Sequence, residues 1–367
     1  MNFTEKHVFL ISDCDIFFHL YADALVQKCD INSDQIIVIV YKSGGKPSIV
    51  KNQNFNYVEY EKKIAKELSS ANTITSISLI SKTAEIVKEI CYQCSDFWHK
   101  YHVFITDDEV DRWKNNLHKK DGLLINENQE ISKNVIFVLS NVLNFIVTEK
   151  YFKIILENIL KRKNFNIVNA SFVFDILPII QSESIKNVLD TINYQKSNRI
   201  LLGSKGFSLK GVFSFLMTNY SSLKNMQIVF FPISLNRRII IDIFLFFLRT
   251  IYRTPIDFIY LGKLNALTYN VMISSCSYFV LQDRGGASSA RLYVKWGCGR
   301  LLIRKGSANE RYFSEVYNIN CLDWESKSLR FLNDEIENKI ILENSLKVKE
   351  EEKRSIQVLN KLYANAN

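Results

Sequence analysis

The sequence predicts an α/β protein with two domains of parallel sheet, each sheet covered by helices on both faces. Short apolar runs alternate with segments of helical spacing in both halves of the chain, as in strand–helix–strand units. A polar stretch at 180–199 without a clean period interrupts this alternation. The chain of 367 residues, 47% of them hydrophobic, is large enough to bury two cores.

The first half supplies the elements of one domain. An apolar run at 7–13 reads as a buried strand, and helical spacing follows over 15–29. A second buried strand at 35–45 closes in a Ser-Gly-Gly turn. A strand and a helix follow over 76–90, and another strand with polar residues at its carboxyl end follows over 101–110.

The second half repeats the pattern. The segments 199–216, 258–276 and 277–306 each pair an apolar run with helical spacing, and 226–235 adds a further strand. The tail is charged and has helical spacing. We therefore predict an N-terminal domain, a linker, a C-terminal domain and a terminal helix, at residues 1–180, 181–198, 199–340 and 341–367.

Charge and cysteine content narrow the partners and the compartment. A net charge of +9 suits an anionic partner such as nucleic acid, an acidic membrane or a phosphorylated substrate. The sequence has no basic–aromatic stripe and no known nucleic-acid module, so we expect no nucleic-acid partner. Seven irregularly spaced cysteines, with no leader segment, indicate reduced thiols in the cytoplasm. Cys91 and Cys94 form a single CxxC motif without a second pair at zinc spacing. We interpret them as buried thiols rather than a metal site, and we expect no metal.

The apolar run 239–248 has two interpretations. It is too short to span a bilayer, carries Asp242 and has arginines on both sides. We favour a core helix of a large domain. The alternative is a helix that lies on a membrane with its arginines among the head groups.

A glycine-rich turn links a predicted strand to a predicted helix in the second domain. Gly285 and Gly286 let a ligand approach the backbone, and the first amides of the helix have no internal partners. These amides and the helix dipole form an anion site. Ser288 and Ser289 add hydroxyl donors, and Arg284 adds a guanidinium suited to phosphate. The alternative is a tight turn that binds nothing.

A second turn occupies the equivalent place after the first strand of that domain. Gly203, Ser204 and Lys205 would lie at the same edge of the sheet as the first turn. Together the two turns would hold a diphosphate. Neither turn has the GxGxxG or the P-loop pattern, so a Rossmann oxidoreductase or a P-loop NTPase has no support.

Three titratable residues follow the first strand of the N-terminal domain. Asp13, Asp15 and His19 stand where that domain would face a ligand. A carboxylate or an imidazole there can take a proton from an attacking hydroxyl. The alternative is that Asp13 or Asp15 caps the following helix and that His19 lies at the edge of the core.

Three segments resemble the bacterial transferases of 4-acetamido-4,6-dideoxygalactose (Fuc4NAc) in enterobacterial common antigen synthesis. "ISDCDIFFHLYADAL" resembles the opening strand, turn and helix of that family, with Asp15 and His19 on its Asp and a His. "RILLGSKGFS" resembles its turn after the linker, where Gly203 and Ser204 match and Lys205 is offset. The closing segment 261–315 resembles the family at Lys263, Tyr269, Cys276 and Arg284.

The resemblance implies a GT-B glycosyltransferase, with two Rossmann-like domains facing each other across a cleft and a helical C-terminal tail. It implies transfer from a dTDP-sugar to an undecaprenyl-diphosphate-linked saccharide, without metal or cofactor, by a cytoplasmic protein peripheral to the inner membrane. Lys263 would lie near the nucleotide, with Asp15 the first choice for the base and His19 the second. The family's R-Q-Q-G-I-G-T-like turn is replaced here by Arg284-Gly285-Gly286-Ala287-Ser288-Ser289, and residues 45–165 have no clear register with it.

Two other functions stay open from the sequence. One is a different GT-B enzyme that uses another nucleotide sugar in capsule, O-antigen or lipooligosaccharide assembly. The other is a non-catalytic subunit that binds a nucleotide sugar and releases no product.

Overall fold

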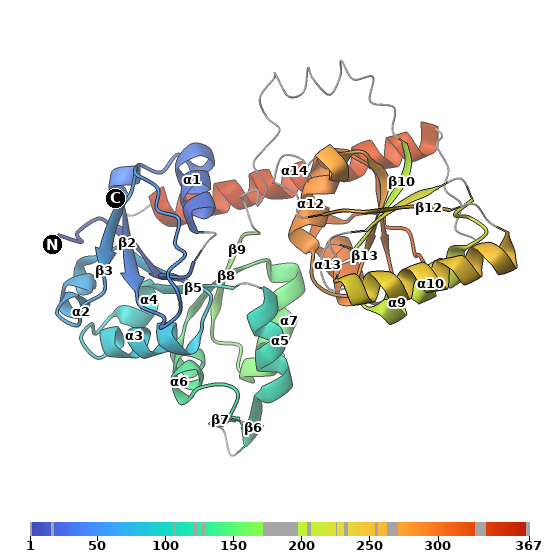
Figure 1. Cartoon of the computed structure of the whole chain (residues 1–367). Helices are drawn as coiled ribbons and strands as arrows, with labels where there is room; N and C mark the ends of the chain where they lie inside the picture. Colours follow the sequence, from blue (N-terminus) through green and yellow to red (C-terminus); the bar gives the residue numbers. More distant parts are fainter. Residues whose placement is uncertain are drawn as a thin grey trace. The chain divides into compact units, whose positions relative to one another are not determined.

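A computed structural model describes most of the chain and divides it into two units (Figure 1). The described residues are 2–15, 18–105, 107–120, 123–126, 129–171, 197–203, 207–224, 226–230, 234–253, 256–262, 271–326 and 335–364. One unit comprises Met1–Phe174 and Glu352–Asn367, and the other comprises Asp175–Glu351. The predicted linker 181–198 lies outside the described residues, except for its last two, which begin a strand.

The N-terminal unit is built on a sheet of seven parallel strands (Figure 1). In spatial order these are β3 (Asn56–Glu59), β2 (Ile36–Tyr41), β1 (His7–Ser12), β4 (Thr73–Ile77), β5 (Tyr101–Phe104), β8 (Asn144–Val147) and β9 (Asn166–Asn169). The central strands are buried almost throughout, because helices cover both faces of a parallel sheet. Strands β1, β2 and β8 are mostly apolar, whereas β4 also buries Thr73, Thr75 and Ser76.

Side chains alternate between the two faces of β1. Phe9 contacts Phe18 and Tyr21 of α1 (Phe18–Cys29), with ring centroids 5.3 and 6.0 Å apart. His7 and Phe9 also contact Tyr363, which belongs to the last helix, α14 (Glu335–Ala364). The end of the chain therefore completes the core of the N-terminal unit.

The remaining elements of the N-terminal unit are short. A small antiparallel hairpin lies outside the main sheet. The hairpin strands are β6 (His118–Lys120) and β7 (Leu123–Ile125), and the helices are η1 (Ser33–Gln35), α2 (Ile64–Glu67), η2 (Leu68–Ser70), α3 (Ser81–Cys91), α4 (Phe97–Lys100), α5 (Asp107–Asn116), α6 (Lys133–Asn141) and α7 (Glu149–Leu160).

The C-terminal unit has five parallel strands (Figure 1). Their spatial order is β12 (Asp257–Tyr260), β11 (Gln227–Phe230), β10 (Ser197–Leu202), β13 (Cys276–Leu281) and β14 (Arg300–Ile303). The helices α9 (Leu209–Asn219) and α10 (Leu235–Tyr252) pack on one face of this sheet. On the other face Phe279 meets Tyr293 of α12 (Ala287–Lys295), and α13 (Ala308–Tyr317) follows β14.

For the run 239–248 the sequence favoured a core helix, but the structure shows a helix that is buried on one side only. It extends over Leu235–Tyr252 as α10, and Ile241, Leu245 and Leu248 are its core-facing residues. Its opposite side exposes several large apolar side chains. Across the described ranges, no helix is both long enough and apolar enough to span a bilayer.

Candidate functional site

Both predicted glycine turns lie at the carboxyl edge of the C-terminal sheet. Strands β10 and β13 pair in parallel, with Leu202 opposite Val280. The amide of Gly203 donates to the carbonyl of Val280 at 2.8 Å. The structure therefore brings the turn after β10 beside the turn after β13, as parallel strands require.

Gly203 has a backbone that other residues would strain. Its φ is +68°, and a Cβ placed on it would lie 2.9 Å from Cβ of Phe207. The neighbouring Ser204 and Lys205, and also Lys263, lie outside the described residues. Of the three residues predicted to bind the donor after β10, the structure therefore describes Gly203.

The turn after β13 ends in two consecutive glycines with left-handed backbone. Gly285 has φ of +82° and Gly286 has φ of +75°. Gly286 is the N-cap of α12, and no side chain caps its first turn. Ser288 and Ser289 lie in that turn, which has no acidic side chain. The free amides and the dipole of this helix favour a negatively charged ligand at this point.

Asn309 holds the backbone of this turn through hydrogen bonds, which the sequence did not indicate. Its side-chain amide donates to the carbonyls of Gln282 and Gly285 at 2.6 and 2.9 Å. Its backbone amide donates to the carbonyl of Asp283 at 2.9 Å, and the residue is buried. The Asp283 carboxylate pairs with Arg304. These bonds fix the backbone on both sides of Arg284, which is half-buried.

Asp13 is occupied with a loop of the N-terminal unit. One carboxylate oxygen accepts from the amide and the hydroxyl of Ser43 at 2.9 and 2.6 Å. Its carbonyl accepts from the amides of Ser48 and Ile49. The hydroxyl of Ser43 is the main cause that lowers the pKa of Asp13. A carboxylate stabilised in its charged form is a weaker base at neutral pH.

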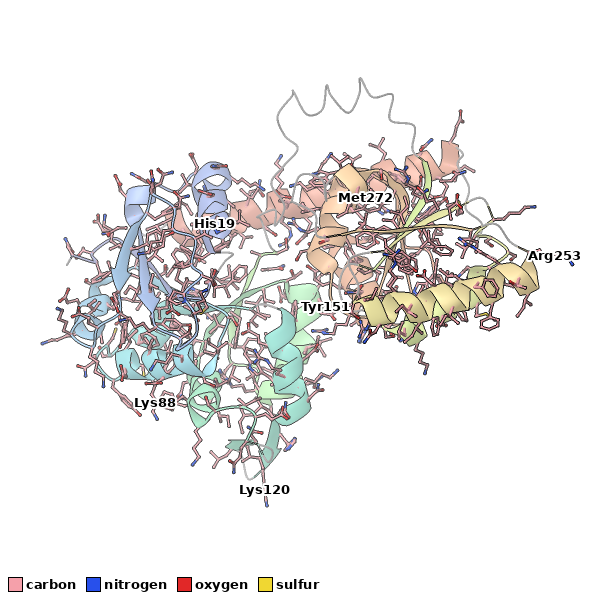
Figure 2. All side chains as sticks on the ribbon, viewed as in Figure 1. His19, Lys88, Lys120, Tyr151, Arg253 and Met272 are labelled. Carbon is pink, nitrogen blue, oxygen red and sulfur yellow. The ribbon has the colours of Figure 1, made fainter. Side chains whose placement is uncertain are left out.

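Asp15 and His19 differ in their hydrogen bonding. A carboxylate oxygen of Asp15 accepts from the amide of Phe18 at 2.7 Å, so it caps the start of α1, the alternative stated for it above. His19 lies on α1 and is labelled in Figure 2. Its Nδ1 is buried without a hydrogen-bond partner among the described residues. A buried polar atom without a partner is rare in folded proteins, and one role that such atoms have is catalytic.

The predicted residues thus fall into two groups. Asp13, Asp15 and His19 belong to the N-terminal unit, and the glycine turns with Arg284 belong to the C-terminal unit. Within the described ranges, no group of three or more His, Cys, Asp or Glu residues has an arrangement that could hold a metal ion.

Sequence comparisons find no relative. No protein-family model matches the chain, and no curated protein matches it in sequence.

Solved structures, in contrast, match over almost the whole chain. HepE of Anabaena in complex with UDP-glucose gives a TM-score of 0.51 at 10% identity, covering 98% of both chains. Sucrose-phosphate synthase of Thermosynechococcus elongatus gives 0.52 at 11% identity, covering 98% of this chain and 93% of the other. This chain has the GT-B fold.

The GT-B fold is also that of a protein named for a different reaction. The UDP-GlcNAc 2-epimerase of Neisseria meningitidis, bound to UDP-GlcNAc, gives a TM-score of 0.51 at 12% identity and covers 98% of both chains. At these identities the fold is shared, and residue roles do not transfer. The function must therefore be argued from this chain's own site.

Proposed function

We propose that this protein is a glycosyltransferase that moves a sugar from a nucleoside-diphosphate donor to a glycan or lipid-linked acceptor in bacterial polysaccharide synthesis. The observation that carries the proposal is the pair of glycine turns at neighbouring ends of β10 and β13, one of them opening an uncapped helix beside Arg284. Proteins of the same fold are seen with UDP-glucose and UDP-GlcNAc, which supports a nucleotide-sugar ligand.

The proposed chemistry follows from the charge that grows on the leaving diphosphate. As the bond between the sugar carbon and the diphosphate oxygen breaks, the first-turn amides of α12, the hydroxyls of Ser288 and Ser289, and Arg284 stabilise that charge. Gly203, Ser204 and Lys205 bind from the other side, with Lys263 near the nucleotide. These groups supply positive charge, so the proposal requires no metal and no cofactor.

The acceptor hydroxyl attacks the sugar carbon and loses its proton to a base of the N-terminal unit. Asp15 is the first candidate from the sequence, followed by His19 and Asp13. The capping bond of Asp15 and the lowered pKa of Asp13 both favour His19, whose buried Nδ1 has no hydrogen-bond partner among the described residues. Removing the base should lower turnover by about 10²–10⁴-fold with little change in donor affinity. Comparing His19→Gln with Asp15→Asn, and Asp13→Asn as a third variant, therefore separates the candidates.

For the donor we propose a dTDP-linked deoxyamino sugar such as Fuc4NAc, from the family resemblance. The second candidate is another nucleotide sugar used in capsule, O-antigen or lipooligosaccharide assembly. We further propose a cytoplasmic protein, peripheral to the inner membrane, because a lipid-linked acceptor is held there and the chain carries a net charge of +9.

A thermal-shift panel of dTDP, UDP, GDP, CDP and CMP tests the ligand class. A nucleotide that binds the native state raises the melting temperature by mass action. A shift with dTDP alone supports the Fuc4NAc donor, and a shift with another nucleotide replaces it. No shift in the folded protein would contradict nucleotide binding. A shift in melting temperature without any product formed would indicate a non-catalytic binding subunit. Conversion of the donor sugar into its epimer, without an acceptor, would indicate an epimerase.

Two substitutions test the site itself. Arg284→Ala should weaken binding of the best nucleotide about tenfold or more, because a charged hydrogen bond to phosphate is lost. Asn309→Asp keeps the size but removes the donor that holds the carbonyls of Gln282 and Gly285, so it should weaken binding as well. Arg311→Ala, on the exposed side of α13, is the matched control. Unchanged affinity in both site variants would contradict the assignment of this turn.

A further inference from the structure

Helix α10 buries only one of its sides. Ile241, Leu245 and Leu248 are 1–5% exposed and pack into the core of the C-terminal unit. Phe244 lies beside them, with its ring 4.2 Å from that of Phe213 on α9. The spacing of these residues places them on a single face of the helix.

The opposite side of α10 is apolar and open to solvent. Its large side chains are 44–69% exposed, and they are Leu235, Ile239, Ile240, Ile243, Phe246, Phe247 and Ile251. At 100° per residue they occupy one broad arc of the helix, which we call the α10 face. Single exposed apolar residues are ordinary on a protein surface, but a contiguous set of this kind marks an interaction site.

Arginines border the α10 face. Arg237, Arg238, Arg249 and Arg253 are all exposed, and Arg253 is labelled at the end of the helix in Figure 2. Asp242 is the acidic residue of α10, and it is engaged by the hydroxyl of Tyr260 at 2.6 Å and by Arg238 at 3.7 Å. The charge along this helix is therefore strongly positive.

Two of these arginines are held in place by the sheet edge. The guanidinium of Arg238 lies over the ring of Tyr260 at 4.5 Å, and that of Arg249 lies over Phe258 at 5.2 Å. Arg249 also donates to the carbonyl of Ile256 at 2.5 Å. Strand β12 thus fixes cationic groups along the border between the core and the α10 face.

We propose that the α10 face docks on the surface of a bilayer that contains anionic lipids. The apolar arc would enter the boundary between head groups and acyl chains, while the bordering arginines bind lipid phosphates. The helix cannot cross the bilayer, because one side belongs to the core of the unit. A second copy of the chain fits this face less well, because four arginines and one aspartate from each copy would meet.

The position of α10 connects this surface to the proposed site. The helix follows β11, so it begins at the same carboxyl edge that carries Gly203 and Gly285. Docking would hold that edge near the membrane, where a lipid-linked acceptor is available. This last consequence rests on the proposed function, whereas the docking itself does not.

Sedimentation of the full chain with lipid vesicles tests the proposal. We expect binding to phosphatidylcholine vesicles that contain phosphatidylglycerol, weaker binding at high salt, and little binding to phosphatidylcholine alone. The variant Ile239→Gln, Ile243→Gln, Phe246→Gln should lose more than tenfold in binding. The matched control changes three apolar residues elsewhere that are at least as exposed, Leu123→Gln, Ile154→Gln and Ile336→Gln, and should bind like the original protein.

A second variant tests the electrostatic part. Arg237→Gln with Arg253→Gln should lower binding to the anionic vesicles about 25-fold and reduce the salt dependence, since each basic residue near the surface contributes about fivefold. All variants change exposed residues, and matching circular dichroism and melting temperature will show that they fold. Nucleotide binding should be unchanged in them, which separates this test from that of the proposed function.

Three results would overturn the proposal. The first is no binding of the original protein to anionic vesicles at low salt. The second is equal binding by the triple variant. The third is a dimer, measured by light scattering, that the triple variant abolishes while lipid binding is absent, because the α10 face would then be an interface between copies.

Discussion

At the scale of single residues, Gly299 directly precedes β14 and lies so close to β13 that it has no room for a side chain. A Cβ on Gly299 would lie 2.0 Å from the carbonyl oxygen of Ser277 and 2.1 Å from the hydroxyl oxygen of Tyr293. That hydroxyl donates to the carbonyl of Cys276 at 2.9 Å, and Tyr293 is fully buried. Ser277 cannot retreat without disturbing the start of the β13–β14 pair, and Tyr293 cannot retreat without losing its hydrogen bond to Cys276.

We therefore expect Gly299→Ala to destabilise the C-terminal unit by about 3 kcal/mol, the upper range for an overpacked site. Gly262→Ala is the matched control, because a Cβ there meets no atom of the described residues within 4 Å. Chemical denaturation of the two variants measures the difference. Equal stability would show that the strands have room to separate at this point.

The candidate site shows which residues a sequence can and cannot identify. Gly285 and Gly286 were predictable, because their position between an apolar run and a helical segment is a local pattern. Asn309 was not, because its partners Gln282 and Gly285 are 27 and 24 residues away and its neighbours in the sequence give no sign of them. The capping bond of Asp15 was foreseen as an alternative, since both of its ends are local.

At the scale of elements, α14 carries residues for both units. Ser345 donates to the carbonyl of Lys295 in the C-terminal unit at 2.7 Å. Asn360 donates to the carbonyl of Cys29 in the N-terminal unit, also at 2.7 Å, and Tyr363 lies in the core there. The sequence predicted a helix over 341–367 from its period, but a period does not name the surface against which a helix packs.

Tyr363→Ala should destabilise the N-terminal unit by about 3–5 kcal/mol, as expected for removing a fully buried aromatic side chain. The ring contacts His7 and Phe9, and its hydroxyl bonds with Thr75 at 3.3 Å. Lys361→Ala, two residues earlier on the exposed side of α14, should cost less than about 0.5 kcal/mol. Thermal unfolding followed by tryptophan fluorescence compares the two, and similar losses would contradict a specific packing role for Tyr363.

The segment 134–147 illustrates a limit of prediction from the sequence at the same scale. Its apolar run could be strand or helix by pattern alone, and the structure divides it into α6 and β8. The side chain of Ser132 accepts from the amide of Val135 and begins the helix. A short buried strand and a buried helical turn have the same composition, so length and caps decide between them.

At the scale of the whole molecule, two buried histidines make stability depend on pH. His7 and His102 lie in the sheet of the N-terminal unit, 1% and 6% exposed. Burial lowers the pKa of each from 6.5 to about 4. The unfolded chain therefore binds these protons before the folded chain does, and stability falls as pH decreases from about 6.5 to 4.

Each histidine should contribute a loss of about 3 kcal/mol between these limits, by linkage of proton binding to folding. Melting temperatures measured across this range should fall steadily, and NMR titration should place both imidazole pKa values near 4. In His7→Gln with His102→Gln the acid-dependent part of the decline should shrink. A melting curve of the original protein that is flat between pH 6.5 and 4 would contradict the burial of these rings as neutral groups.

The two-unit α/β architecture was predictable because alternating strands and helices are read from local period, and the structure confirms it. The order of the strands was not predictable. The sheets run β3-β2-β1-β4-β5-β8-β9 and β12-β11-β10-β13-β14, and each order results from the choice of side to which the chain crosses after each helix. That choice depends on packing between helices distant in sequence rather than on any local signal.

The shared helix α14 has a consequence for folding of the chain during its synthesis on the ribosome. Residues 175–351, which form the whole C-terminal unit, are translated before Glu352–Ala364, which completes the core of the N-terminal unit. The usual order, in which the first domain of a chain folds first, is therefore reversed for the final step. Until Leu359 and Tyr363 leave the exit tunnel, the nascent N-terminal unit exposes His7 and Phe9, a surface suited to a chaperone.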